Sequence, residues 1–127
     1  MDMIHGIGVD IIEIARIKSS LERFANHFEE KIFTKDEIDY CRSKADPSKH
    51  FAGRFAVKEA VMKSMGKGMG QGVDWKDIEI LQKETGQPFL RIQGRGKNIF
   101  EGLRLKEILI SISHEKSYAV GQAIALK

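Results

Sequence analysis

Within residues 4–12, Ile7, Val9 and Ile11 alternate with Gly6, Gly8 and Asp10, and this period of two predicts a strand with one apolar face. The opposite face of the strand carries Gly6, Gly8 and then Asp10. Glycine weakens a strand, so two glycines on one face indicate that another backbone or a ligand comes close there. We therefore expect the chain to fold so that something packs directly on the main chain of this strand.

Asp10 follows a run of apolar and glycine residues, so we expect its carboxylate to be at least partly buried. A buried carboxylate needs a cation, a metal ion or hydrogen-bond donors. The alternative interpretation is that Asp10 stands at the end of the strand and caps the helix that follows. Taken alone, the residue fits the capping interpretation better.

The rest of the sequence carries signals of both helices and strands. Thr34 and Glu37 match a capping box, and Pro47 occupies the favoured first position of the longest helix. The predicted helices are residues 14–24, 35–43, 47–65 and 97–105, and the further predicted strands are 77–82, 88–92, 108–113 and 118–126. With no internal repeat and no linker, we expect one α+β domain over residues 1–127, with an antiparallel sheet and a long central helix.

The composition excludes several classes of protein. A single cysteine, Cys41, rules out an intrachain disulfide and a cysteine-based zinc site. The apolar runs are far shorter than the ~20 residues that cross a bilayer, and the first residues lack the pattern of a signal peptide. We therefore expect a cytoplasmic protein without a membrane partner. A net charge of +3 permits an anionic partner: nucleic acid, a phosphorylated small molecule or an acidic protein.

Glu59 and Lys63 lie one turn apart on the predicted long helix, at the edge of a Phe and Met stripe that we assign to the core. One interpretation is a surface ion pair worth about 0.3–0.5 kcal/mol. The other is a carboxylate at the rim of the core, with a lysine beside it to meet an anion. Asp10 and Glu59 would together supply two hard oxygen ligands on two rigid elements. Such a pair suits Mg²⁺, which usually shares its coordination sphere with water and phosphates.

Residues 66–72 carry glycine at every second position. The amides of this loop could cradle phosphate oxygens, or the loop could simply be flexible. It does not match the phosphate-binding loop of nucleotide hydrolases, and Gly6 and Gly8 lack the third glycine of a dinucleotide-binding motif.

Ser111, Ser113 and His114 close another predicted strand, and the two serines share one face of it. Ser113 and His114 point to opposite sides, which argues against a nucleophile and base pair. His114 could donate to a phosphate, carry a proton or be structural. The histidines at positions 5, 27 and 50 have no ligand spacing with His114, and Cys41 is expected to be a small core residue.

Three segments together resemble the holo-acyl-carrier-protein synthases. They are the opening motif at residues 6–17, FAGRFAVKEAVMKSMGKG at 51–68 and ISISHEKSYA at 110–119. The segments occur in the family's order, and the similarity runs over almost the full length of the chain.

The resemblance implies a 4′-phosphopantetheinyl transferase of similar α+β fold. Such an enzyme moves phosphopantetheine from coenzyme A to a serine of apo acyl carrier protein, releases adenosine 3′,5′-bisphosphate and supports fatty acid biosynthesis. The resemblance also implies a homotrimer with its sites between neighbouring subunits. Because the nucleophile would be the partner's serine, the chain would need no activated nucleophile of its own.

Residue by residue, the resemblance implies Mg²⁺ on Asp10 and Glu59 and places Lys63 beside the coenzyme phosphates. Lys63 would offset charge that develops during the transfer. Glu59, directly or through a metal-bound water, is our candidate base for the serine, so these two are the predicted catalytic residues. The predicted coenzyme-binding residues are Lys63, Arg54, His114, Gly66 and Gly68, and the predicted carrier-protein contacts are Arg16 and Arg23.

The match is incomplete ahead of the long helix, where Ala45-Asp46-Pro47, flanked by Lys44 and Lys49, replaces most of the basic residues that the family often has there. The contacts to the 3′-phosphate of the coenzyme therefore stay open. The alternative function is a non-catalytic module that binds nucleic acid or an acidic protein through basic side chains. Little favours it, since the basic residues are dispersed among acidic ones and no aromatic stacking motif is present, so we expect no nucleic-acid partner.

Overall fold

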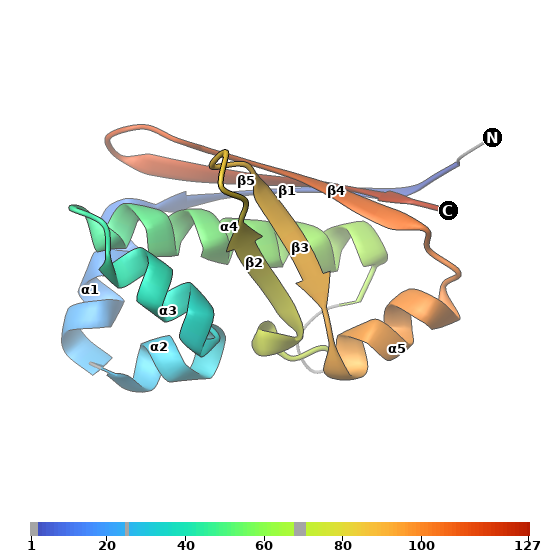
Figure 1. Cartoon of the computed structure of the whole chain (residues 1–127), viewed down its shortest axis with the longest axis horizontal. Coiled ribbons are helices and arrows are strands. Elements are labelled where there is room, and N and C mark those ends of the chain that lie inside the picture. The colour runs from blue at the N-terminus through green and yellow to red at the C-terminus, as the bar shows by residue number, and fades with distance from the viewer. Residues whose placement is uncertain (1–2, 25, 68–70) are drawn as a thin grey trace.

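The computed structural model describes residues 3–24, 26–67 and 71–127 (Figure 1). Its elements, in chain order, are β1 (Ile4–Glu13), α1 (Ile14–Phe24), α2 (Asn26–Ile32), α3 (Lys35–Arg42), α4 (Pro47–Met65), the 3₁₀ turn η1 (Trp75–Asp77), β2 (Ile78–Gln82), β3 (Pro88–Ile92), α5 (Gly94–Gly102), β4 (Glu107–His114) and β5 (Tyr118–Leu126). No helix within these described ranges combines the length and the apolar composition needed to cross a bilayer.

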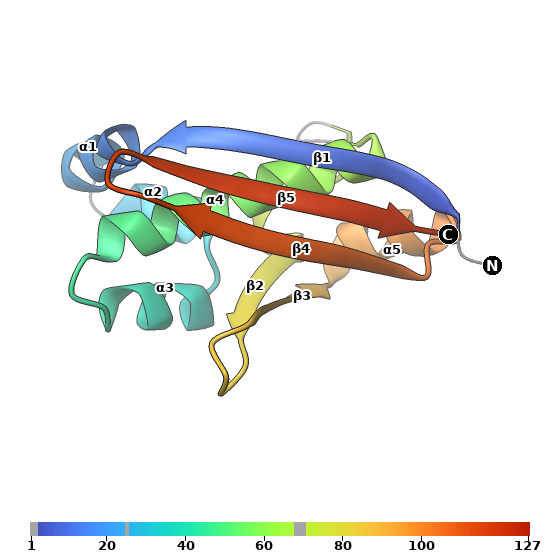
Figure 2. The ribbon, with the colours of Figure 1, turned by 90° about the horizontal axis from the view of Figure 1, so that it is seen from above.

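The five strands form two antiparallel sheets. Strands β1, β5 and β4 lie side by side in that order, with β5 in the centre, while β2 and β3 form a separate hairpin (Figure 2). Helix α4 runs along one face of the three-stranded sheet, with α1, α2 and α3 at one end and α5 at the other (Figure 1). The predicted α+β class, the antiparallel sheet and the long central helix are confirmed.

Glycine allows α4 to lie directly on the main chain of the sheet. A Cβ atom at Gly8 would overlap the carbonyl oxygen of Ala60, and one at Gly6 would overlap that of Ser64. The expected close approach to the glycine face of β1 is therefore confirmed, and of the two predicted neighbours, a backbone or a ligand, it is the backbone of α4.

The apolar face of β1 is the one left open. Ile7, Val9 and Ile11 are 62%, 54% and 62% exposed, and Leu109 of β4 and Tyr118 of β5 are also exposed. An uncovered apolar sheet face of this extent is typical of a surface that another protein surface covers.

Two clusters of buried side chains make up the core. One joins α4 to the three-stranded sheet, the β2–β3 hairpin and α5, and the other joins α4 to α1, α2 and α3. Cys41 is fully buried in the second cluster, as predicted, and burial raises the pKa of its thiol to about 12. The predicted core stripe of α4 is confirmed for Phe51, Met62 and Met65, whereas Phe55 is half-buried and stacks on Trp75.

The capping box at the start of α3 is present. The backbone N–H of Glu37 donates to Thr34 Oγ1 over 3.3 Å, and the N–H of Thr34 donates to Glu37 Oε1 over 2.9 Å. Helix α2 was not predicted. Helix α5 begins at Gly94 rather than at residue 97, because Asp77 accepts the Gly96 N–H over 3.1 Å and thereby stabilises a first turn that two glycines would otherwise disfavour.

Candidate active site

The close packing of β1 on α4 brings Asp10 beside the helix, because Asp10 shares the face of β1 that carries the glycines. Lys63 Nζ donates to Asp10 Oδ1 over 3.2 Å and to the carbonyl oxygen of Val9 over 3.0 Å. The Asp10 side chain is 20% exposed, which confirms its partial burial. The strand continues to Glu13, so Asp10 does not stand at a helix N-terminus and the capping interpretation is wrong.

Glu59 lies close enough to Asp10 for the two carboxylates to repel each other. Burial raises the pKa of Glu59 above its ordinary value, the charge of Asp10 raises it further, and Lys63 acts in the opposite direction. The sequence-based pairing of Asp10 with Glu59 therefore corresponds to a shared electrostatic site. A simple Glu59–Lys63 surface pair does not describe it, since the hydrogen bonds of Lys63 reach across to β1.

A groove of about 340 Å³ lies beside these groups. Glu59, Lys63 and Gly66 line it, as do Lys67 and Trp75, which the sequence did not single out. Gly66 ends α4 with a positive φ of 78°, so the chain turns away and opens the groove at the end of the helix. The predicted coenzyme-binding residue Gly68 lies outside the described residues.

Glu59 in this groove and Asp10 beside it form a donor set that fits a magnesium ion. Asp10 and Glu59 offer carboxylate oxygens, and no cluster of three or more His, Cys, Asp or Glu in the described part of the chain is placed to hold a metal. Two carboxylates suit Mg²⁺, which keeps several waters and completes its coordination with substrate phosphates. A divalent cation would also relieve the repulsion that raises the pKa of Glu59.

Two predicted coenzyme-binding residues lie elsewhere. Arg54 and His114 line a separate cavity of about 200 Å³, together with His50 and Gln82. Arg54 is 2% exposed, its Nη2 donates to Gln82 Oε1 over 2.5 Å, and within the described residues its buried Nε has no hydrogen-bond partner. Within one chain, then, Arg54 and His114 do not line the groove of Glu59.

His50 is a residue of this cavity that the sequence reasoning missed. Its ring centroid lies 5.7 Å from that of His114 and 5.9 Å from that of Tyr40, both edge to face. The sequence shows no ligand spacing between His50 and His114, and the two rings meet only because α4 packs against β4. The available signal was the i, i+4 spacing of His50 and Arg54, which places both on one side of α4.

Lys58 is a second residue that the sequence reasoning missed. It is fully buried, and its Nζ donates to Glu37 Oε1 over 2.9 Å, to the carbonyl oxygen of Trp75 over 3.0 Å and to that of Ile78. Burial lowers the pKa of Lys58, and the charge of Glu37 opposes that change. Because Trp75 lines the groove of Glu59, this buried lysine holds one wall of the groove against α4.

Arg16 and Arg23 are exposed on α1. The Arg23 guanidinium lies 5.5 Å from the ring centroid of Phe24, which is itself 56% exposed. A groove of about 820 Å³ runs between α1, α2 and η1, lined by Phe24 and Phe28 on one side and Trp75 on the other. Trp75 thus lines both this groove and the groove of Glu59.

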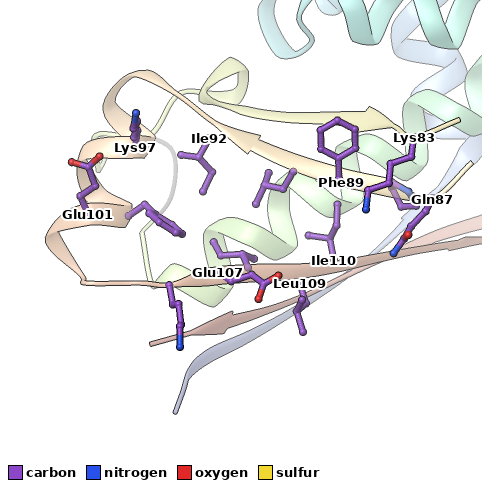
Figure 3. Close-up of a pocket in the computed structure, with 14 residues that line it drawn as sticks. Lys83, Gln87, Phe89, Ile92, Lys97, Glu101, Glu107, Leu109 and Ile110 are labelled. Carbon is purple, nitrogen blue, oxygen red and sulfur yellow. The ribbon is translucent and has the colours of Figure 1, made fainter. Parts of the chain in front are cut away.

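A further cavity, of about 470 Å³, lies between β3, α5 and β4 (Figure 3). Phe89, Ile92 and Ile110 give it apolar walls, and Lys97 and Glu101 stand at its α5 side. The described residues among those predicted for the active site do not line this cavity. Ser111 and Ser113 point outward from β4 and are exposed.

Comparison with known proteins gives a consistent result. Residues 6–123 match the family model of the 4′-phosphopantetheinyl transferase superfamily. The holo-[acyl-carrier-protein] synthase of Koribacter versatilis (strain Ellin345) is 43% identical over 122 residues, covering 96% of this chain and 98% of that protein. That of Alkaliphilus oremlandii (strain OhILAs) is 44% identical over 124 residues, covering 98% and 100%.

Solved structures of the same kind share the fold. The holo-[acyl-carrier-protein] synthase of Neisseria meningitidis superposes with a TM-score of 0.91 at 29% identity, covering 98% of this chain and 100% of that one. The Bacillus anthracis protein in complex with CoA (3′,5′-ADP) gives a TM-score of 0.81 at 35% identity, covering 98% of each chain. The Helicobacter pylori protein in complex with coenzyme A gives 0.84 at 31% identity, covering 94% and 98%.

Proposed function

The chain belongs to the 4′-phosphopantetheinyl transferase superfamily, and we propose that Asp10, Glu59 and Lys63 form the centre at which it acts. Its activity is the transfer of phosphopantetheine from coenzyme A to apo acyl carrier protein, a step that serves fatty acid biosynthesis. The observation that carries the proposed centre is the meeting of Asp10 and Lys63 through a 3.2 Å hydrogen bond, with Glu59 beside them.

We assign Asp10 and Glu59 as ligands of Mg²⁺. Bound there, the ion supplies Lewis-acid polarisation of the coenzyme's diphosphate and neutralises charge on the leaving group. The Lys63 side chain is 53% exposed, so its ammonium group can turn from Asp10 toward an incoming phosphate. Its role is to offset the charge on the oxygens of the transferred phosphoryl group.

The transfer itself is a displacement at phosphorus. The serine hydroxyl oxygen of the carrier protein forms a bond to the phosphorus of phosphopantetheine, and the bond from that phosphorus to adenosine 3′,5′-bisphosphate breaks. The serine proton goes to the Glu59 carboxylate, directly or through an intervening water. The place of Glu59 supports this role, because its half-buried carboxylate lines the groove beside Lys63, where the phosphate and the serine would meet.

We propose a homotrimer as the active form, with sites between subunits. The open apolar face of β1, with Ile7, Val9 and Ile11 more than half exposed, supports a neighbouring copy as its cover. The separation of the Arg54 and His114 cavity from the Glu59 groove also supports it. A coenzyme held between two copies can contact the groove of one and the cavity of the other.

We propose that the carrier protein docks on α1, with Arg16 and Arg23 meeting its acidic residues. The groove between α1 and η1 supports this placement, because its Trp75 wall is shared with the groove of Glu59. A carrier protein docked there would bring its serine near the transfer centre. The cytoplasm remains the proposed location, in keeping with the single free and buried cysteine.

The test is a mass measurement on apo acyl carrier protein incubated with coenzyme A and the enzyme, with and without Mg²⁺. We expect the carrier protein to gain the mass of phosphopantetheine only with the metal. Asp10→Ala should abolish this gain, whereas Asp36→Ala, at an exposed carboxylate on α3, should not change it. Near wild-type turnover of Asp10→Ala at limiting Mg²⁺ would overturn the ligand assignment.

A further inference from the structure

The cavity lined by Arg54 and His114 contains a buried cationic group with a hydrogen-bond donor that is unsatisfied in the described part of the chain. Arg54 is almost completely buried, yet within the described residues its Nε lacks an acceptor, and one guanidinium nitrogen is held by Gln82. A buried and unsatisfied donor on a charged group costs free energy. A ligand that brings oxygen atoms into the cavity would satisfy it.

His50 adds a second imidazole to this cavity. Its ring stands edge to face against His114 at 5.7 Å and against Tyr40 at 5.9 Å, so its position is fixed from both β4 and α3. His50 is half-buried and lines the same 200 Å³ space as Arg54. Two imidazoles and a guanidinium around one small space are the donors that recognise a phosphate group.

We propose that His50 is a further phosphate-binding residue of this cavity, and that it takes up a proton when a phosphate monoester binds. Coenzyme affinity then rises as the pH falls toward 6.5. The inference rests on the proposed binding of coenzyme A by this chain and names one more residue and one linked proton for it.

The charges around His50 explain the linkage. Arg54 and Lys49 on α4 and Lys44 in the segment between α3 and α4 present positive charge to it, the imidazole of His114 on β4 faces it, and Tyr40 on α3 contributes a neutral ring edge. Burial, and after it these cations, hold the pKa of His50 below its ordinary value, so the free imidazole is neutral near pH 7.

A bound phosphate dianion reverses this balance. An opposite charge within about 4–6 Å raises the pKa of a histidine by roughly one to three units. His50 would then be protonated in the complex at a pH where it is neutral in the free protein. By linkage, a proton taken up on binding makes the affinity increase as the pH falls.

The experiment measures coenzyme A binding to the full-length protein with saturating Mg²⁺ at pH 6.5 and 8.5, by calorimetry in two phosphate-free buffers of different ionisation enthalpy. This range lies above the second pKa of a phosphate monoester, about 6, so the ligand stays largely dianionic. The comparison variant is His50→Gln, which keeps a neutral donor and cannot titrate. The matched control is His27→Gln, at an exposed histidine on α2.

For the wild type and His27→Gln we expect roughly tenfold tighter binding at pH 6.5 than at pH 8.5, with net proton uptake. His50→Gln should bind nearly as well at pH 8.5 and lose most of the gain at pH 6.5. Dephospho-coenzyme A lacks the monoester. It should therefore bind to the wild type and to His50→Gln with the same small pH dependence.

Unchanged pH dependence and proton uptake in His50→Gln would overturn the inference, even if transfer activity is intact. A pH dependence that persists with dephospho-coenzyme A would also overturn it. Failure of the wild type to bind coenzyme A at either pH would instead contradict the proposed function.

Discussion

Lys58 and Glu59 are consecutive residues of α4 and lie in opposite environments. Lys58 is fully buried, and its three ammonium hydrogens meet Glu37 and the carbonyl oxygens of Trp75 and Ile78. Glu59 is half-buried at a groove, and burial and then the charge of Asp10 destabilise its charged form. The two side chains leave the helix about 100° apart around its axis, and this difference in direction places one in the core and the other at the groove.

The difference teaches how the chain distributes its charges. The buried charge is satisfied by partners from three other elements, so it fixes the positions of those elements. The charge at the groove is left unbalanced in the protein alone, and a metal ion and a phosphate substrate would balance it. We assign charged side chains of the first kind to the fold, and we propose that those of the second kind serve the reaction.

Replacing Glu59 by Gln should produce the largest effect. We expect the rate of phosphopantetheine transfer to fall by about a thousandfold or more, because the variant loses a metal ligand and the candidate base together. Mass spectrometry of the carrier protein measures the rate, and urea unfolding should show a protein at least as stable as the wild type. A large loss of stability in Glu59→Gln would contradict the view that Glu59, unlike Lys58, does not stabilise the fold.

Replacing Lys58 by Met should have the opposite effect to Glu59→Gln, because it should act mainly by lowering the stability of the fold. Removing one partner of a buried pair leaves Glu37 without its cation, which typically costs about 3–5 kcal/mol of stability. Urea unfolding measures this loss. The double variant Lys58→Met/Glu37→Gln should lose less than the sum of the two single variants, because the uncompensated carboxylate is gone. Additive losses would show that the two groups do not act as a pair.

Arg16→Glu extends the comparison to an exposed charge on α1. We expect about a tenfold higher KM for the carrier protein, a weaker salt dependence and an unchanged free energy of unfolding, because a surface charge acts mainly on association. Arg95→Glu, the same charge reversal at an exposed position on α5, is the matched control. Equal effects of the two variants on the KM would show that α1 is not part of the docking surface.

The pH dependence of stability should give the smallest effect. Because the pKa of Glu59 is raised in the folded protein, the folded state binds more protons than the unfolded state between the ordinary value of 4.5 and the raised value. Glu59 therefore lowers the free energy of unfolding as the pH rises through this window. Without metal, Glu59→Gln should become progressively more stable than the wild type over the same window, as measured by urea unfolding. A constant difference between the two proteins would show that Glu59 is not destabilised at the groove.

Much of the proposed transfer centre could be predicted from the sequence, because its signals are local. The glycines of β1 predict a close backbone contact, and the two acidic residues stand at recognisable places on two elements. Helix α2 was missed since its sequence NHFEEKI is mostly polar, and it buries only Glu29 and Ile32. The sequence predicts the start of α5 at residue 97 rather than at Gly94, because the first turn of the helix depends on a contact with Asp77 of η1, which lies outside the local sequence.

The roles of Lys58 and His50 could not be predicted, because each depends on elements that are distant in the sequence. A lysine in the middle of a helix is ordinarily exposed, and only the packing of α3, η1 and β2 around α4 makes Lys58 internal. His50 gains its neighbour when α4 crosses β4 at Gly53, where a Cβ atom would lie only 2.9 Å from Ile112 Cγ2. Likewise, the sequence predicts that Arg54 and Glu59 lie on one helix. It does not show that their side chains line two different cavities.

The main-chain contact between β1 and α4 has a mechanical consequence. Where two elements meet through side chains, small rotamer changes can absorb thermal motion or a neighbouring substitution. At Gly6 and Gly8 that compliant layer is missing, so the strand carrying one acidic group and the helix carrying the other behave as a single stiff body. Disturbances in the surrounding helices can then loosen the periphery without changing the separation of the two carboxylates.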